Sequence, residues 1–311
     1  MTTIDVEAAV ESTRAARRPR RDLGGPVGTT SPMGRAVGLI GTIIAHAFLI
    51  FWGLIVLIPM IWAVANSFKS DIEILGSPWA LPETLRFDNY ARAWNTAQFG
   101  DFFLNTIVVT VVALLATLFL ASLAAFTMAK FRFPGRGLIF GLLVASMTFP
   151  IVLALVPLFF IMISMNLLDS RLGLIMVYIG FGMPFSIFFL TAFFRSIPDE
   201  FMEAARVDGC SYWGCFFRVM LPLAKPGLIS VGIFNFMSMW NQYILPLVLI
   251  SDKSKYVLGL GVAKLSVDQG YRSDWGGLFA GMVIAMVPVL IVYCLFQRQV
   301  QSGLMAGGVK A

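Results

Sequence analysis

The chain has 311 residues, of which 58% are hydrophobic and 13% are charged, and it carries a formal net charge of +6. Its mean hydropathy is +0.83, and a water-soluble domain of this size could not carry that composition without exposing large apolar patches. The composition therefore excludes an ordinary water-soluble protein and places the chain in a membrane.

The amino-terminal residues 1–37 are rich in arginine, proline and glycine, as in the stretch RAARRPRRDLGGPVGTTSP. This composition predicts a disordered, basic cytoplasmic tail that anionic lipid headgroups attract. A cleavable export signal is disfavoured, because the apolar run that follows is too long and has no small-residue cleavage site.

Six long runs without Asp, Glu, Lys or Arg follow the tail. A bilayer core of about 30 Å needs roughly 20 apolar residues per helix. Lipid offers no partner for backbone N–H and C=O groups, so runs of this length predict helices. The sequence thus predicts an all-α membrane protein, with a six-helix transmembrane domain over residues 38–298. The runs are Leu39–Ala65, Phe102–Met128, Leu138–Met165, Leu172–Phe194, Leu228–Ile250 and Gly277–Phe296.

Lysine and arginine residues are concentrated on one side of these predicted spans. That side holds the amino-terminal tail, the second and fourth loops and the carboxy-terminal tail, residues 299–311. Because positively charged loops stay in the cytoplasm, both termini are predicted to be cytoplasmic. The asymmetry explains the net charge, so no nucleic-acid partner is implied.

The fourth loop, residues 195–227, is the most polar stretch in the second half of the chain. Its pattern predicts two short helices, with Ser196 capping the first, Gly209 ending it in a left-handed conformation and Ser211 capping the second. A short helix of this kind fits a groove on a soluble partner, although an ordinary solvated loop explains the pattern equally well. The residues expected to share one side of the first helix are Phe201, Ala204, Ala205 and Asp208.

The fifth run carries a polar stripe, because Asn235, Ser238 and Gln242 fall at i, i+3 and i+7 of one helix face. Amides pair with sugar hydroxyls, and aromatic rings stack on the apolar faces of sugar rings. The alternative is that these polar residues hydrogen-bond neighbouring helices. The candidate substrate-path residues are Asn235, Ser238, Trp240, Asn241, Gln242 and Tyr243.

Several chemistries are poorly supplied. The six runs contain no carboxylate, no lysine and one histidine, so the groups of a hydrolytic site are missing. No lysine follows a glycine, as a phosphate-binding loop requires, and the five-residue spacing of Cys210 and Cys215 matches no common zinc pattern. The sequence predicts a non-enzymatic protein without a metal site, whose nucleotide energy, if any, comes from another chain.

The spacing in the fourth loop resembles the EAA loop of binding-protein-dependent ABC importer permeases, which reads EAA-x3-G-x9-I-x-LP. Val219 stands where this pattern has isoleucine. Further stretches, NSFKSDIEI, FDNYARAW, WNQYILPLVL and QRQVQSGLMAGGVK, resemble the carbohydrate branch, specifically the second permease subunit of the maltose-type importer. The resemblance covers about residues 40–311. The matching positions in the loop are Glu203, Ala204, Ala205, Gly209, Leu221 and Pro222.

The resemblance implies a type I ABC importer permease in a bacterial inner membrane, transporting a di- or oligosaccharide. Its expected partners are a second permease subunit, two cytoplasmic ATPase subunits that bind ATP and magnesium, an extracytoplasmic sugar-binding protein and membrane lipid. This chain would hold no cofactor and would couple to one ATPase through the six loop residues. The alternative is a self-contained secondary carrier for a small polar solute, which copurification of an ATPase would exclude.

Overall fold

The computed structural model describes residues 32–272 and 274–308, and these residues form helices and connecting turns without a strand. The predicted basic tail lies mostly outside the described residues. The chain divides between Pro59 and Met60 into two compact units. Helix α2 (Pro32–Asn66) crosses that division, and its residues Ile40–Asn66 are long and apolar enough to span a bilayer.

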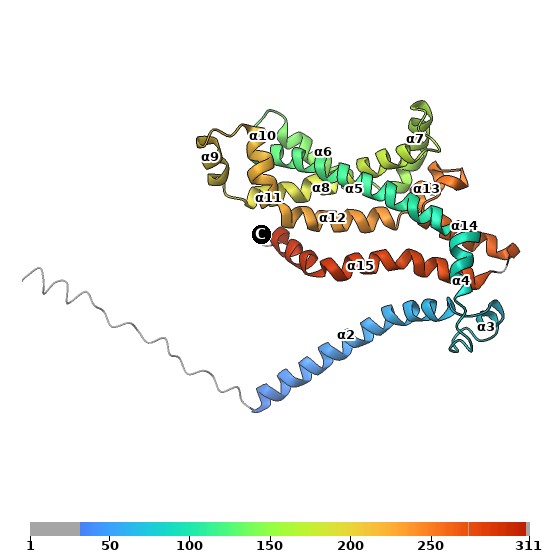
Figure 1. Cartoon of the computed structure of the whole chain (residues 1–311). Helices are drawn as coiled ribbons and strands as arrows, with labels where there is room; N and C mark the ends of the chain where they lie inside the picture. The colour runs from blue at the N-terminus through green and yellow to red at the C-terminus, as the bar shows by residue number, and fades with distance from the viewer. Residues whose placement is uncertain (1–31, 273, 309–311) are drawn as a thin grey trace, which may run out of the picture. The chain divides into compact units, whose positions relative to one another are not determined.

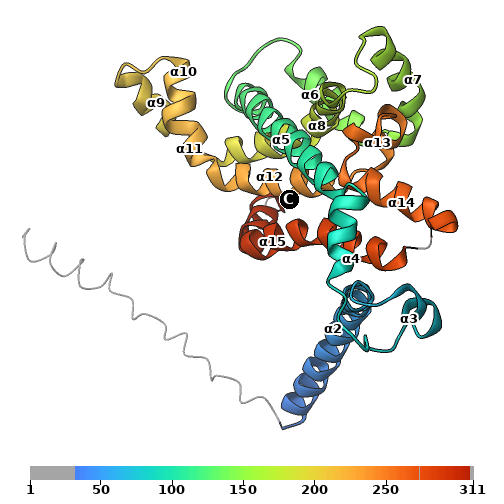
Figure 2. The ribbon, with the colours of Figure 1, turned by 45° about the vertical axis from the view of Figure 1, so that its right-hand side comes forward.

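The second unit is built on four longer helices that run side by side (Figure 1, Figure 2). They are α5 (Phe99–Lys130), α8 (Arg171–Ser196), α12 (Lys225–Trp240) and α15 (Trp275–Gly308). Small side chains allow close approach of helix backbones, and Ala113, Ala121 and Ala125 of α5 are fully buried. α15 continues past residue 298, where the transmembrane domain was expected to end.

Two predicted spans are not single helices. The third consists of α6 (Arg136–Met147) and α7 (Ile151–Ser164), which meet at 106°, because Pro150 lacks an N–H group and disfavours helical geometry in the residue before it. The fifth ends at Trp240, and α13 (Ile244–Leu249) follows a break. The prediction of continuous helices there was wrong. Within the described residues, four helices can each span a bilayer, or up to six if bent pairs count as spans.

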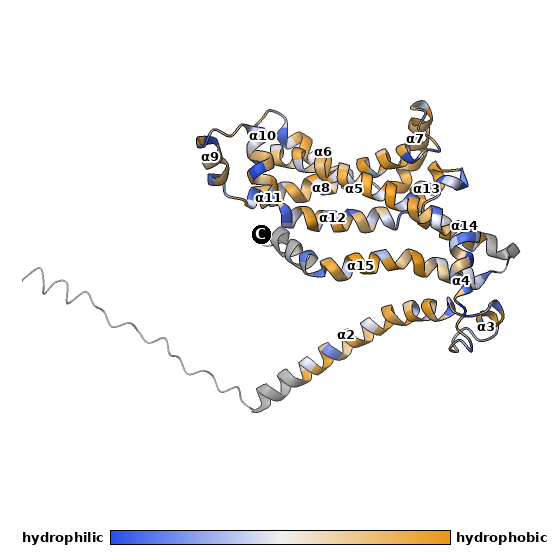
Figure 3. Cartoon of the chain, viewed as in Figure 1, coloured by the Kyte–Doolittle hydropathy of each residue, from blue (hydrophilic) through white to orange (hydrophobic). Residues whose placement is uncertain are grey.

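Short elements cap the two ends of these helices. At one end lie α9 (Glu200–Val207), α10 (Tyr212–Cys215), a π-helical turn η2 (Phe216–Met220) and α11 (Leu221–Leu223). At the other end lie α3 (Asp71–Gly76), α4 (Asp88–Ala91), η1 (Arg92–Thr96), η3 (Lys253–Lys255) and α14 (Leu258–Arg272). Figure 3 shows hydrophilic residues gathered at both ends and apolar residues along the long helices. This distribution fits a bilayer around the middle of the second unit.

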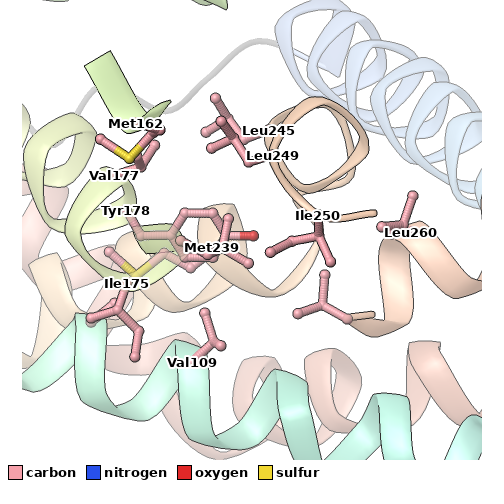
Figure 4. Close-up of a cluster of buried hydrophobic side chains, with 13 residues drawn as sticks. Val109, Met162, Ile175, Val177, Tyr178, Met239, Leu245, Leu249, Ile250 and Leu260 are labelled. Carbon is pink, nitrogen blue, oxygen red and sulfur yellow. The ribbon is translucent and has the colours of Figure 1, made fainter. Parts of the chain in front are cut away.

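The core of this unit holds two larger apolar clusters along the same helices. One joins α5, α7, α8, α12 and α13, and Figure 4 shows its side chains, among them Val109, Tyr178, Met239 and Leu245. The other lies toward the α9 end and includes Phe126, Phe194 and other residues of α5, α8 and η2. Packing of this kind fixes α5, α8 and α12 to one another.

Candidate functional site

A cavity of about 1010 Å³ lies between α6, α7, α8, α12 and α13. Methionine and phenylalanine side chains make up much of its wall, and no Asp, Glu, Lys, Arg or His of the described residues lines it. An uncharged wall does not favour an ionic solute, because a charge without a partner at this depth is costly. The methionines and phenylalanines of the wall are Met147, Met162, Met165, Met176, Met239, Phe149, Phe181, Phe185 and Phe234.

All three residues of the predicted polar stripe line this cavity. Asn235 is buried, and its Nδ2 donates to Ser186 Oγ at 2.8 Å and to the carbonyl oxygen of Val231 at 3.0 Å. Ser238 is exposed, and Gln242 accepts a hydrogen bond at Oε1 from the N–H of Ile244 at 3.1 Å. The stripe therefore gives the apolar wall a polar edge.

The other three candidate residues of this region are not part of the cavity wall. Trp240 is buried on the side of α12 that faces α15, where its Nε1 donates to the carbonyl oxygen of Ala285 at 3.0 Å. Asn241 is exposed and donates to the carbonyl oxygen of Met237, and Tyr243 is 46% exposed. Sequence reasoning did not single out the methionines of the wall, because methionine in an apolar run gives no signal that distinguishes a cavity from ordinary core.

The second candidate site is the segment from α9 to α11, which joins α8 to α12. Gly209 has φ +83° and Ser211 Oγ accepts from the N–H of Gly214 at 3.2 Å, so both predictions about the turn are confirmed. Ser196 does not cap α9. It belongs to the last turn of α8 and donates to the carbonyl oxygen of Phe193, while Asp199 takes the position before α9.

The side chains of α9 divide between a solvent face and a face toward the body of the protein. Glu203 and Ala204 are exposed, as are Phe201 and Asp208, whereas Ala205 is only 8% exposed. Ala205 therefore does not share the outer face as expected, and it lies buried in a helix that contacts η2. At the far end of the segment, Leu221 is partly buried and Pro222 is exposed, in the first turn of α11.

At the other end of the helices, a charged cluster fixes the loop after α13. Asp169 has φ +52°, and its carboxylate accepts from the N–H groups of Ser251 and Asp252 at 2.9 and 3.0 Å and pairs with Lys255 at 3.0 Å. Partial burial acts to raise the pKa of Asp169, but these hydrogen bonds and the lysine outweigh it and lower the pKa. Its partners, first Asp169 and then Asp252, raise the pKa of Lys255.

Comparisons with known proteins agree with this geometry. Residues 117–305 match the family model described as "Binding-protein-dependent transport system inner membrane component". The chain is 48% identical, over 85% of its length and 87% of the relative's, to the diacetylchitobiose uptake system permease protein of Streptomyces coelicolor. It is 32% identical, over 85% of its length and 94% of the relative's, to the arabinooligosaccharides transport system permease protein of Bacillus subtilis.

A solved structure supports the same fold. A chain of a bacterial ABC transporter involved in the import of the acidic polysaccharide alginate superposes with a TM-score of 0.74 at 27% identity, covering 86% of this chain and 98% of that one. The predicted multi-pass, all-α permease fold is thus confirmed. Taken with the bundle of spans, the uncharged cavity and the exposed segment between α8 and α12, these matches show that the chain belongs to the inner membrane components of binding-protein-dependent transport systems.

Proposed function

We propose that this chain is one of two permease subunits of an ATP-driven importer of neutral oligosaccharides. One observation carries the proposal: α8 and α12 both line the uncharged cavity, and the exposed segment α9–α11 joins these two helices. A force applied to the segment therefore reaches two walls of the cavity. A mobile loop that was not held at both ends could not transmit it.

The cavity supports the choice of substrate class. Its wall offers apolar side chains to the ring faces of a sugar, and Ser238 and Gln242 can pair with hydroxyl groups. The relatives named for diacetylchitobiose and for arabinooligosaccharides support a di- or oligosaccharide as the substrate. Because no Asp, Glu, Lys, Arg or His among the described residues lines the wall, we expect acidic sugars to be poor substrates.

The exposed face of α9 supports the partner assignment. An extracytoplasmic binding protein would deliver the sugar, a second permease would complete the path, and two cytoplasmic ATPases holding ATP and magnesium would supply the energy. Glu203 and Ala204 are exposed and would contact one ATPase, with Gly209, Leu221 and Pro222 shaping the segment around them. Ala205, which is buried, would help to hold α9 against the body of the protein.

The test is transport by the reconstituted assembly. The tagged chain is purified with its partners from native membranes and placed in liposomes that contain ATP, with the binding protein outside. We expect uptake of labelled diacetylchitobiose or arabino-oligosaccharide that requires hydrolysable ATP, and we expect Glu203→Lys to leave the complex assembled but to uncouple ATP hydrolysis from uptake. Uptake that persists without ATP and collapses with a protonophore would instead establish a secondary carrier.

A further inference from the structure

Lys130, the last residue of α5, is a lysine buried where the long helices meet the α9 segment. Its side chain is only 3% exposed, and Nζ donates to the carbonyl oxygen of Ile197 and to Asp199 Oδ1, each at 2.6 Å. Ile197 directly follows α8 and Asp199 directly precedes α9. One ammonium group therefore joins the end of α5 to the short link between two other helices.

The surroundings favour a cation at this point. A buried lysine is costly unless it is paired, and both of its bonds here are charge-assisted. The carbonyl of Ile197 belongs to the negative end of α8, and the carboxylate of Asp199 lies at the positive end of α9. Because Asp199 is 69% exposed, its ion pair is weakened by solvent, and the shielded bond to Ile197 is the firmer part of the link.

A second contact joins the same end of α5 to the same segment. The ring of Phe131, the next residue, packs edge-on against Tyr212 with centroids 5.2 Å apart, and the guanidinium carbon of Arg206 lies 4.1 Å from the centre of that tyrosine ring. Arg206 is part of α9, so α9 is held at its start through Lys130 and near its end through Tyr212. Both attachments lead to residues 130 and 131.

The other end of this connection reaches the cavity wall. A Cβ atom placed on Gly182, which lines the cavity, would lie 3.1 Å from Thr117 Cγ2 of α5 and 2.9 Å from Asn235 Oδ1 of α12. Helices α5, α8 and α12 are therefore closely packed against one another beside the cavity. A displacement of α5 is passed directly to the wall at this height.

We propose that Lys130 is a positioning residue that makes α9 move together with α5 as well as with α8. The inference rests on the proposed function, because the load on α9 is the movement of a partner ATPase. Without Lys130, α9 stays covalently joined to α8 but can pivot at residues 197–199. Part of the ATPase movement is then absorbed at that pivot and does not reach α5.

The main test compares sugar transported per ATP hydrolysed by the reconstituted transporter. We expect Lys130→Met to lower this ratio about tenfold, a typical size for an allosteric coupling, while ATP hydrolysis continues. Lys130→Arg keeps a cation with several donors and should restore most of the ratio. Arg132→Met removes an exposed cation two residues further along and serves as the matched control, with the ratio of the wild type.

A structural readout separates this inference from the proposed function. Hydrogen exchange of residues 197–208, measured on the chain in nanodiscs, should be faster in Lys130→Met than in the wild type, and unchanged in Arg132→Met. If the wild type transports no sugar, the proposed function fails, and the exchange data still decide whether Lys130 holds α9. Unchanged exchange, faster exchange spread over α5 and α8, or faster exchange with an unchanged transport ratio would each overturn the inference.

Discussion

Asn235 of α12 donates from Nδ2 to Ser186 Oγ of α8 at 2.8 Å, in a buried position beside the cavity. The same nitrogen also donates to the carbonyl oxygen of Val231, so both of its hydrogens are used within the protein. The amide nitrogen of Asn235 therefore holds two helices together. Ser238 and Gln242, which are more exposed on the same stripe, are better placed to meet a substrate.

Removing either partner of the bond between Asn235 and Ser186 should destabilise the bundle, and both losses should include the energy of this one bond. Interhelical hydrogen bonds in membrane proteins contribute about 0.6 kcal/mol on average and up to about 1.7 kcal/mol. We expect Asn235→Ala and Ser186→Ala each to lower the apparent Tm in nanodiscs. The loss of stability in the double variant should be smaller than the sum of the two single losses, because both single variants remove the same bond. Ser238→Ala should leave Tm unchanged while reducing uptake. Strictly additive losses would show that the bond contributes nothing.

Gly182 and Gly180 offer a matched pair on the cavity wall. A Cβ on Gly182 would come within 2.9 Å of Asn235 Oδ1 and 3.1 Å of Thr117 Cγ2, whereas a Cβ on Gly180 would meet nothing within 4 Å. Overpacking of a filled site costs about 1–3 kcal/mol, so Gly182→Ala should lower the apparent Tm and the uptake rate. Gly180→Ala should match the wild type in both measurements, and equal effects of the two substitutions would contradict the close packing of α8.

The spans could be predicted because the thickness of a bilayer sets the length of an uncharged run. The bend in the third span could not, because its composition stays apolar through the break and a proline alone does not mark one: the helix breaks at Pro150, whereas Pro157 and Pro184 lie inside helices. Asn235 and Ser238 both reached the cavity because helical periodicity places residues three apart on one face, whereas Gln242 lines it from the turn that follows the end of α12 at Trp240. The position of Trp240 outside the cavity wall could not be predicted for a different reason: its direction depends on the packing of α12 against α15, which the sequence of one helix does not contain.

The α9 segment likewise combines features that the sequence predicts with features that it does not. Gly209 and Ser211 were predictable because a left-handed turn and a helix cap are local requirements of the backbone. Ser196 was misassigned because α8 extends two residues further than the apolar run, since a helix outside the bilayer core no longer needs apolar side chains. Lys130 bonds to Ile197 and Asp199, which lie 67 and 69 positions further along the chain, so no local sequence pattern predicts this contact.

Gly209 should tolerate asparagine and reject leucine. Its φ of +83° costs a side chain about 1–2 kcal/mol, although nothing lies within 4 Å of the position where a Cβ would stand. The penalty is therefore conformational, and asparagine visits this region more readily than leucine. We expect Gly209→Leu to reduce transport per ATP while the complex still assembles, and Gly209→Asn to retain most of it. Equal loss with both would indicate a steric contact with the partner instead.

The Asp169 cluster predicts a pH dependence of stability. A lowered pKa means that the stabilisation by Asp169 is complete above its ordinary pKa of 3.8 and is lost as the pH falls through the lower folded value. The raised pKa of Lys255 sets the limit at high pH, because the stabilisation by Lys255 is complete below pH 10.5 and is lost as the pH rises through the higher folded value.

Asp169→Asn keeps a residue that accepts φ +52°, yet removes the charge. We expect this variant to have a lower apparent Tm than the wild type at pH 7, with the difference shrinking as the pH falls below 3.8. Asp101→Asn, which removes an exposed carboxylate from the first turn of α5, is the control and should show a much smaller difference at pH 7. A Tm gap for Asp169→Asn that stays constant down to pH 3 would mean that the carboxylate is not the source of the stabilisation.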